Sequence, residues 1–196
     1  MKIQILLLFL CFTFSTFGQI PTKPEDISPL LIGEKIPELR LRSSTSQLVN
    51  LKQYSSNKPT ILVFYRGGWC PFCNKQLSGI AEVEAEILKL GYQIVAISPD
   101  QISKLKETSE KIKSNYLLLS DSASVLATAM GIVFKVPNHY LKVIDEASGS
   151  KNKEFLSVPA VFVLNTKGEI EFEYINPNFK NRLSSKLLLS VLKGLN

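Results

Sequence analysis

Residues 60–73 read TILVFYRGGWCPFC, and residues 74–90 continue with NKQLSGIAEVEAEILKL. The segment 60–65 is an unbroken run of β-branched, aliphatic and aromatic residues, which predicts a strand buried on both faces of a sheet. After Arg66-Gly67-Gly68, apolar residues recur at near-helical spacing as far as Gly91. This pattern predicts an amphipathic helix. The short loop between strand and helix is therefore held by two packed elements.

Two cysteines, Cys70 and Cys73, lie where the predicted helix begins. Residues three apart on a first helical turn share one side, so the two sulfurs are close enough to bridge. Pro71 suits the first helical position and makes Cys70 the N-cap, where free N–H groups and the helix dipole favour a thiolate. Arg66 acts in the same direction if its side chain turns toward the sulfurs. The strand, CxxC and helix together predict a redox-active pair.

The alternatives to redox chemistry are a structural disulfide and half of a zinc site. Zinc takes about four Cys or His ligands, and only His139 and Cys11 remain to complete a set. We therefore expect no metal.

The first residues of the chain differ in composition from the rest. Met1-Lys2 precedes an apolar run over residues 3–14, and small residues follow up to Gly18. This pattern predicts a signal peptide over residues 1–18 and an exported protein, periplasmic or secreted. A transmembrane anchor is the alternative, but the apolar run is shorter than the roughly 18 residues of a spanning helix. Cys11 would leave with the signal peptide.

The remainder of the chain predicts one domain with a leader. Residues 19–36 are proline-rich and predict an extended leader, and residues 37–196 form the domain. The net charge is +6, but the lysines are spread over the chain without the dense basic run of a nucleic-acid surface. We expect no nucleic-acid partner, and membrane contact only through the signal peptide.

Strands and helices alternate along the domain. Strands are predicted over 39–41, 47–51, 92–97, 116–119, 160–164 and 169–175, helices over 102–113, 124–130, 136–144 and 183–195, and a polar loop over 145–157. This order predicts an α/β protein with a central mixed, mostly parallel sheet, helices on both faces and a closing antiparallel hairpin. It is the arrangement of a thioredoxin-like fold.

Several short motifs resemble the peroxiredoxins of the alkyl hydroperoxide reductase/thiol-specific antioxidant (AhpC/TSA) family. They are LIGEKIP at 31–37, Phe64-Tyr65, ISPD at 97–100, LLSD at 118–121, and FVLN at 162–165 with Gly168. The resemblance covers about residues 31–192. It implies a thioredoxin fold, no cofactor, a peroxide substrate and a thioredoxin-like reductant.

The resemblance also bears on the two cysteines. In peroxiredoxins the site reads Pro-x-x-x-Thr-x-x-Cys after the Phe-Tyr pair, and the last cysteine attacks peroxide. Without gaps, that pattern places Arg66 at the proline, Cys70 at the threonine and Cys73 at the attacking cysteine. The resemblance thus favours Cys73 as the sulfur that meets peroxide, with Cys70 resolving. The helix-start argument favours Cys70 as the more exposed thiolate. We nevertheless expect Cys73 to be oxidised by peroxide and Cys70 to resolve it, so that Cys70 is then the sulfur attacked by the external reductant.

A second departure from the peroxiredoxin pattern lies at Pro159. An arginine of the family's pattern is replaced there by proline, and Val158-Pro159 resembles the cis-proline of thioredoxins that faces the CxxC pair. We therefore expect a cis Val158-Pro159 bond across from the cysteines. Trp69 also resembles thioredoxin, as a contact or a packing residue, and Arg66 is the candidate for the missing charge.

The leading hypothesis is a thiol peroxidase that reduces hydrogen peroxide and organic hydroperoxides through the Cys70/Cys73 pair and is recycled by a thioredoxin-like donor. The alternative is an exported thiol-disulfide oxidoreductase acting on protein disulfides. A third reading is a non-catalytic binding module with a structural disulfide. Consumption of peroxide with a dithiol distinguishes the first from the others.

Overall fold

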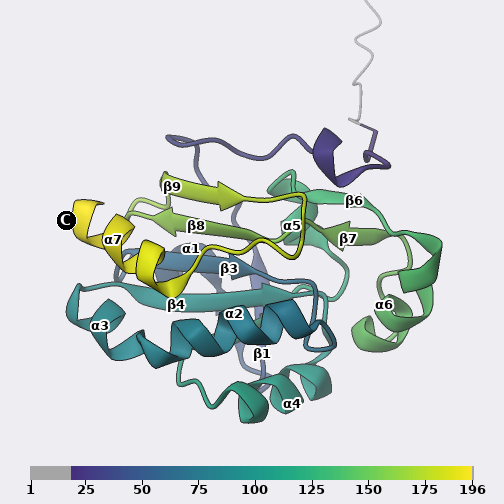
Figure 1. The fold of residues 1–196 in the computed structure, drawn as a ribbon, viewed down its shortest axis with the longest axis horizontal. Coiled ribbons are helices and arrows are strands. Elements are labelled where there is room, and N and C mark those ends of the chain that lie inside the picture. The colour runs from purple at the N-terminus through teal and green to yellow at the C-terminus, as the bar shows by residue number, and fades with distance from the viewer. Residues whose placement is uncertain (1–18, 196) are drawn as a thin grey trace, which may run out of the picture.

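The computed structural model describes residues 19–195, and the predicted signal peptide over 1–18 lies outside these residues. A seven-stranded sheet forms its centre (Figure 1). In spatial order its strands are β2 (Leu48–Asn50), β1 (Arg40–Ser43), β5 (Leu117–Ser120), β4 (Gln93–Ser98), β3 (Thr60–Phe64), β8 (Ala160–Leu164) and β9 (Ile170–Ile175). The predicted α/β class and mixed sheet are confirmed.

The sheet is mostly antiparallel rather than mostly parallel as predicted, because only the pairings in its middle are parallel. Strand β3 pairs in parallel with β4, and β4 with β5. The hairpins β1–β2 and β8–β9 flank these three strands and pair antiparallel with them. All five residues of β3 are buried, as its unbroken apolar run predicts for a central strand.

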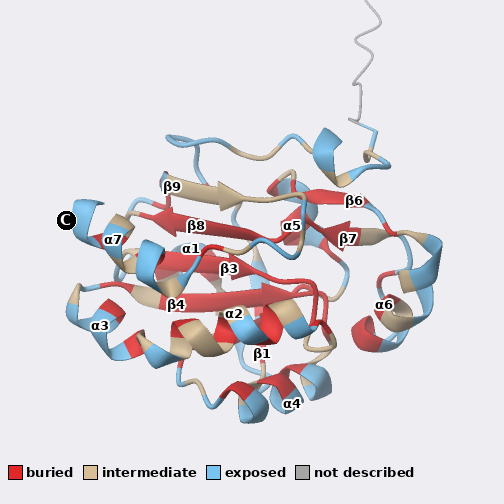
Figure 2. Cartoon of the chain, in the orientation of Figure 1, coloured by how far each residue is buried: buried red, intermediate tan, exposed pale blue. Residues whose placement is uncertain are grey.

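Helices cover both faces of the sheet. They are α1 (Leu51–Ser55), α2 (Pro71–Glu82), α3 (Glu84–Lys89), α4 (Ile102–Ile112), α5 (Val125–Ala129), α6 (Leu141–Ser148) and α7 (Ser185–Leu195). Successive side chains of a strand point to opposite faces. Ile61 and Val63 accordingly pack into the core that includes residues of α2, α4 and α7, and Leu62 and Phe64 into the core of α1 and α5. The buried strands form a continuous red layer between exposed helix faces in Figure 2.

The helix predicted after the CxxC pair is two helices. Val83 leaves helical geometry (φ −108°, ψ 9°) and separates α2 from α3. Glu84, only 8% exposed, turns inward, and its Oε2 accepts the backbone N–H of Asn115 at 3.2 Å. The apolar periodicity continues across this break, so the pattern alone predicts a single helix.

The region predicted as a helix over 136–144 and a polar loop over 145–157 contains a second, two-stranded sheet. Strands β6 (Val133–Lys135) and β7 (Phe155–Ser157) pair antiparallel. Between them lie the 3₁₀ turn η2 (Asn138–Tyr140) and α6. The buried Asn152 organises the return of the chain, because its Oδ1 accepts the N–H of Phe155 and its amide donates to Phe155 O and Ser124 Oγ.

The N-terminal segment begins with a 3₁₀ turn, η1 (Pro24–Asp26), and lies against the small sheet. The N–H of Lys135 in β6 donates to Pro21 O at 2.8 Å. Within the described range 19–195, no helix has the length and apolar character to span a bilayer.

Candidate active site

The two cysteines lie at the start of α2, directly after the loop that follows β3. Cys70 is the N-cap of the helix (φ −90°, ψ 117°) and Pro71 occupies its first turn, as predicted. Both sulfurs are free thiols, and Cys70 and Cys73 are 1% and 0% exposed. The pair is therefore buried in the core at the end of the central strand.

The surroundings of the pair shift the pKa values of the two thiols in opposite directions. The pKa of Cys70 is lowered to about 6, although burial acts in the opposite direction. The largest cause is a hydrogen bond from the Cys73 thiol, and the Cys73 backbone N–H and the charges of Arg66 and Arg182 add to it. Burial, followed by the same bond to Cys70, raises the pKa of Cys73 well above its usual range. These surroundings favour a thiolate on Cys70 and a protonated Cys73.

Arg182 contacts the pair directly, and the sequence analysis missed it. Its Nη2 donates to Cys73 Sγ at 3.2 Å, its Nη1 to Gln76 Oε1 at 3.1 Å and its Nε to Phe179 O at 2.7 Å. It belongs to the connection 176–184 between β9 and α7. Pro159 stands where the family has an arginine, and this indicated that another residue must supply the positive charge beside the cysteines. No local pattern identified Arg182 as its source.

Arg66 lies where the sequence analysis placed it, next to the pair. It is 3% exposed. Its guanidinium carbon lies 4.2 Å from the Phe179 ring centroid, 4.4 Å from that of Tyr140 and 4.9 Å from that of Trp69. Its positive charge is one cause of the lowered pKa of Cys70.

Four aromatic residues, Trp69, Phe72, Tyr140 and Phe179, form a cover beside the cysteines. The rings of Trp69 and Tyr140 lie 5.4 Å apart, and those of Phe72 and Phe179 lie 5.7 Å apart. Trp69 and Phe72 pack against the core cluster that contains both cysteines. Trp69 is therefore a packing residue of the site that also contacts Arg66.

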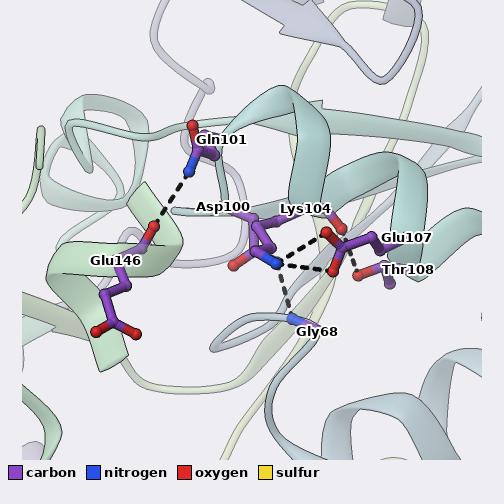
Figure 3. A network of polar contacts seen from close by, with 7 residues as sticks. All are labelled: Gly68, Asp100, Gln101, Lys104, Glu107, Thr108 and Glu146. Carbon is purple, nitrogen blue, oxygen red and sulfur yellow. Dashed lines mark hydrogen bonds and ion pairs between the residues drawn. The ribbon is translucent and has the colours of Figure 1, made fainter. Parts of the chain in front are cut away.

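A buried acid holds the loop before Cys70 (Figure 3). Asp100 is 1% exposed and its Oδ2 accepts the N–H of Gly68 at 2.8 Å. Burial raises the pKa of Asp100 to about 6. Gly67 has φ +137°, and a Cβ there would collide with the Trp69 indole and the Asp100 carboxylate, while one at Gly68 would collide with Thr108. Glycine is required at both positions, because the loop passes close to Asp100 and its own Trp69 at Gly67 and to α4 at Gly68.

The expected cis bond at Val158-Pro159 is absent, because no described peptide bond is cis. Ser157 pairs with Val133 in β7, and the Val158 N–H donates to Ile132 O at 2.8 Å. The extended trans chain thus passes directly from β7 into β8. Pro159 is buried and lines a cavity together with Arg66.

His139, one of the residues weighed as a zinc ligand, is exposed, and its ring stacks on Tyr140 at 4.1 Å. Among residues 19–195, no group of three or more His, Cys, Asp or Glu side chains is placed to hold a metal ion.

Comparison with known proteins decides the family. Residues 32–173 match the model of the AhpC/TSA family. The chain belongs to the AhpC/TSA family. It is 28% identical over 106 residues to peroxiredoxin Bcp of Escherichia coli, covering 54% of the chain and 67% of that protein. It is 25% identical over 157 residues to Bcp of Bacillus subtilis, covering 80% and 92%.

Solved peroxiredoxins share the fold. Peroxidoxin BcpB of Mycobacterium tuberculosis superposes with a TM-score of 0.69 at 20% identity, over 84% of this chain and 97% of that one. Reduced Prx3 of Vibrio vulnificus, solved with hydrogen peroxide, gives a TM-score of 0.71 at 15% identity, over 83% and 99%. The predicted thioredoxin-type fold and the peroxiredoxin resemblance are confirmed. The protein is an oxidoreductase of the peroxiredoxin type.

The prediction of an exported, periplasmic or secreted protein is wrong. The Bcp peroxiredoxins that the chain matches are cytoplasmic bacterial proteins. The proposed membrane contact through residues 1–18 has no support from these relatives. The composition of an apolar N-terminal segment suggested export, but it is separate from the family match, which begins at residue 32.

Proposed function

We propose that this peroxiredoxin reduces hydrogen peroxide and organic hydroperoxides through the Cys70/Cys73 pair, and that a thioredoxin-like protein restores the dithiol. The arrangement of the two thiols is the observation that carries the proposal. They share one proton, Arg66 lies beside Cys70, and Arg182 donates to Cys73. A thiolate next to a proton donor and two cations is suited to breaking an O–O bond, because negative charge moves onto the leaving oxygen.

In the proposed reaction, the Cys70 thiolate attacks the terminal peroxide oxygen. The S–O bond forms as the O–O bond breaks, which gives a sulfenic acid and an alkoxide. The Cys73 thiol protonates the alkoxide to an alcohol and becomes a thiolate. It then attacks the Cys70 sulfur, which forms the disulfide and releases hydroxide. The dithiol has lost two electrons to the peroxide, and a reduced thioredoxin-like donor returns them by thiol–disulfide exchange.

The reverse order is the second candidate. The gap-free family pattern places Cys73 at the attacking position, and the 3.2 Å bond from Arg182 favours negative charge on its sulfur. We favour Cys70 because the thiolate is the nucleophile and the lowered pKa of Cys70 supports a thiolate at this sulfur. Activity on protein disulfides is not favoured, since it rested on the cis-proline analogy.

The test is consumption of hydrogen peroxide by the wild type, Cys70→Ser and Cys73→Ser, with dithiothreitol and separately with thioredoxin and its reductase. We expect multiple turnovers by the wild type with either donor and loss of turnover with thioredoxin in both variants. Wild-type exchange with disulfides in the absence of any peroxide consumption would contradict the proposal. Cys11→Ser is the matched control and should retain full turnover.

A further inference from the structure

A cavity of about 220 Å³ adjoins Arg66 between η2, the β7–β8 junction and the connection 176–184. Its walls are largely apolar and include Phe134, Tyr140, Pro159, Pro177 and Phe179. Arg66 also lines it, and no Asp or Glu does. The cavity thus combines apolar walls with one buried cation.

Among residues 19–195 the guanidinium of Arg66 has no hydrogen-bond acceptor, although its charge acts on the Cys70 sulfur. Arg66 is 3% exposed, and among residues 19–195 its side chain forms only ring contacts, with no ion pair or hydrogen bond. An unpaired buried charge is costly. Cation–π contacts offset part of that cost, but the rings offer no lone-pair acceptor to the five N–H donors of a guanidinium.

The other polar side chains at the cavity do not supply an anionic partner for Arg66. His139 and Ser157 line it, and Ser157 is 4% exposed. Neither carries a negative charge at neutral pH. The cavity therefore suits a ligand with a negatively charged group, to pair with Arg66, and an apolar part, to pack against the walls.

We propose that the cavity binds a small organic carboxylate, with its carboxylate paired to Arg66 and its apolar body against Phe134, Tyr140 and Phe179. A carboxylate matches the planar fork of a guanidinium with two parallel hydrogen bonds. The volume corresponds to about seven water molecules in the liquid, so a single ring or a short chain fills it. Inorganic anions fit poorly, because the apolar walls leave most of their oxygens without donors. Arg66 also lies beside Cys70, so a bound carboxylate shares this residue with the proposed function.

The test uses phenylacetate as the probe, with the full chain and titration calorimetry. Trp69 is the only tryptophan and contacts Arg66, so its fluorescence provides a second readout. We expect saturable one-to-one binding of phenylacetate, at least about tenfold weaker binding of its neutral analogue phenylacetamide, and no competition by sulfate. Equal affinity for phenylacetate and phenylacetamide, displacement by equimolar sulfate, or no binding would overturn the proposal.

Two variants localise the site, and one is a matched control. Arg66→Gln removes the charge and should abolish phenylacetate binding. Ser157→Leu keeps Arg66 and fills the cavity, so it should weaken binding at least about tenfold while the fold is verified by its circular dichroism. Arg40→Gln changes an exposed arginine on β1 and should bind as the wild type does. Wild-type affinity in both cavity variants would contradict the assignment, whatever the peroxidase assay shows.

Discussion

Replacement of Cys73 tests why Cys70 is acidic. The hydrogen bond from the Cys73 side chain is the largest cause of the lowered pKa of Cys70. Cys73→Ala removes that donor, and Cys73→Ser replaces the thiol with a hydroxyl that also donates. The two variants therefore differ in the one interaction at issue.

The size of the effect follows from the bond that is lost. A hydrogen bond to a charged group contributes about 1.5–3 kcal/mol, and one pKa unit corresponds to about 1.4 kcal/mol. Cys73→Ala should therefore raise the pKa of Cys70 by about 1 to 2 units, from the wild-type value of about 6. Cys73→Ser should stay within about half a unit of the wild type, since a hydroxyl donates at least as well.

The assay is the pH dependence of iodoacetamide alkylation of the reduced protein, followed by mass spectrometry of the peptide that contains residue 70. Reading this peptide keeps Cys11 out of the measurement. Limited access to the buried thiol lowers all rates but leaves the midpoint unchanged. A wild-type midpoint near the ordinary thiol value of about 8.5 would refute the thiolate assignment. Equal midpoints in the Ala and Ser variants would refute the hydrogen bond as its cause.

Three further changes test the surroundings of the pair. Arg182→Met should lower kcat/KM for peroxide by about 10- to 100-fold through loss of a charged hydrogen bond. Lys180 is exposed on the same connection, and Lys180→Met should have no effect. Equal kcat/KM values for Arg182→Met and the wild type would contradict the role of Arg182. Asp100 binds a proton more readily in the folded state, with a pKa of about 6 against 3.8, so the unfolding free energy of the wild type should fall as pH rises from 4 to 7, by up to about 3 kcal/mol. Asp100→Asn should lose this contribution but keep the one from Asp121, whose pKa burial also raises to about 6. Its decrease in denaturant titrations should therefore be smaller than that of the wild type, and an unchanged slope would contradict the buried carboxylate. Gly67→Ala should destabilise by about 1–3 kcal/mol more than Gly91→Ala in the same titrations, because Gly91 also has a positive φ but nothing near its Cβ position.

Much of the fold was predictable because its signals are local. The apolar run of β3, the Asn165 to Gly168 turn between β8 and β9, and Gly91 after α3 each determine one element. The small sheet β6–β7 was not predictable, since its strands have three residues each. Their pairing depends on Asn152, whose buried amide has no sequence signature.

The site was predictable where sequence neighbours are also spatial neighbours. Cys70, Cys73, Arg66 and Trp69 lie within eight residues, and the helix start brings them together. Arg182 reaches Cys73 across 109 residues of sequence, and only the tertiary fold reveals that contact. The thioredoxin analogy predicted that Pro159 follows a cis bond and faces the cysteines. The bond is trans, because β7 already delivers an extended chain, and Pro159 shares a cavity with Arg66.

Trapping of sulfenic acid in the two single variants tests most directly that the Cys70/Cys73 pair meets peroxide, and in which order. Each reduced variant receives one equivalent of hydrogen peroxide and a dimedone-type probe, and the labelled residue is located by mass spectrometry. We predict labelling of Cys70 in Cys73→Ser and little labelling of Cys73 in Cys70→Ser. Labelling of Cys73 alone would reverse the order, and no labelling in either variant would contradict peroxide reduction by this pair.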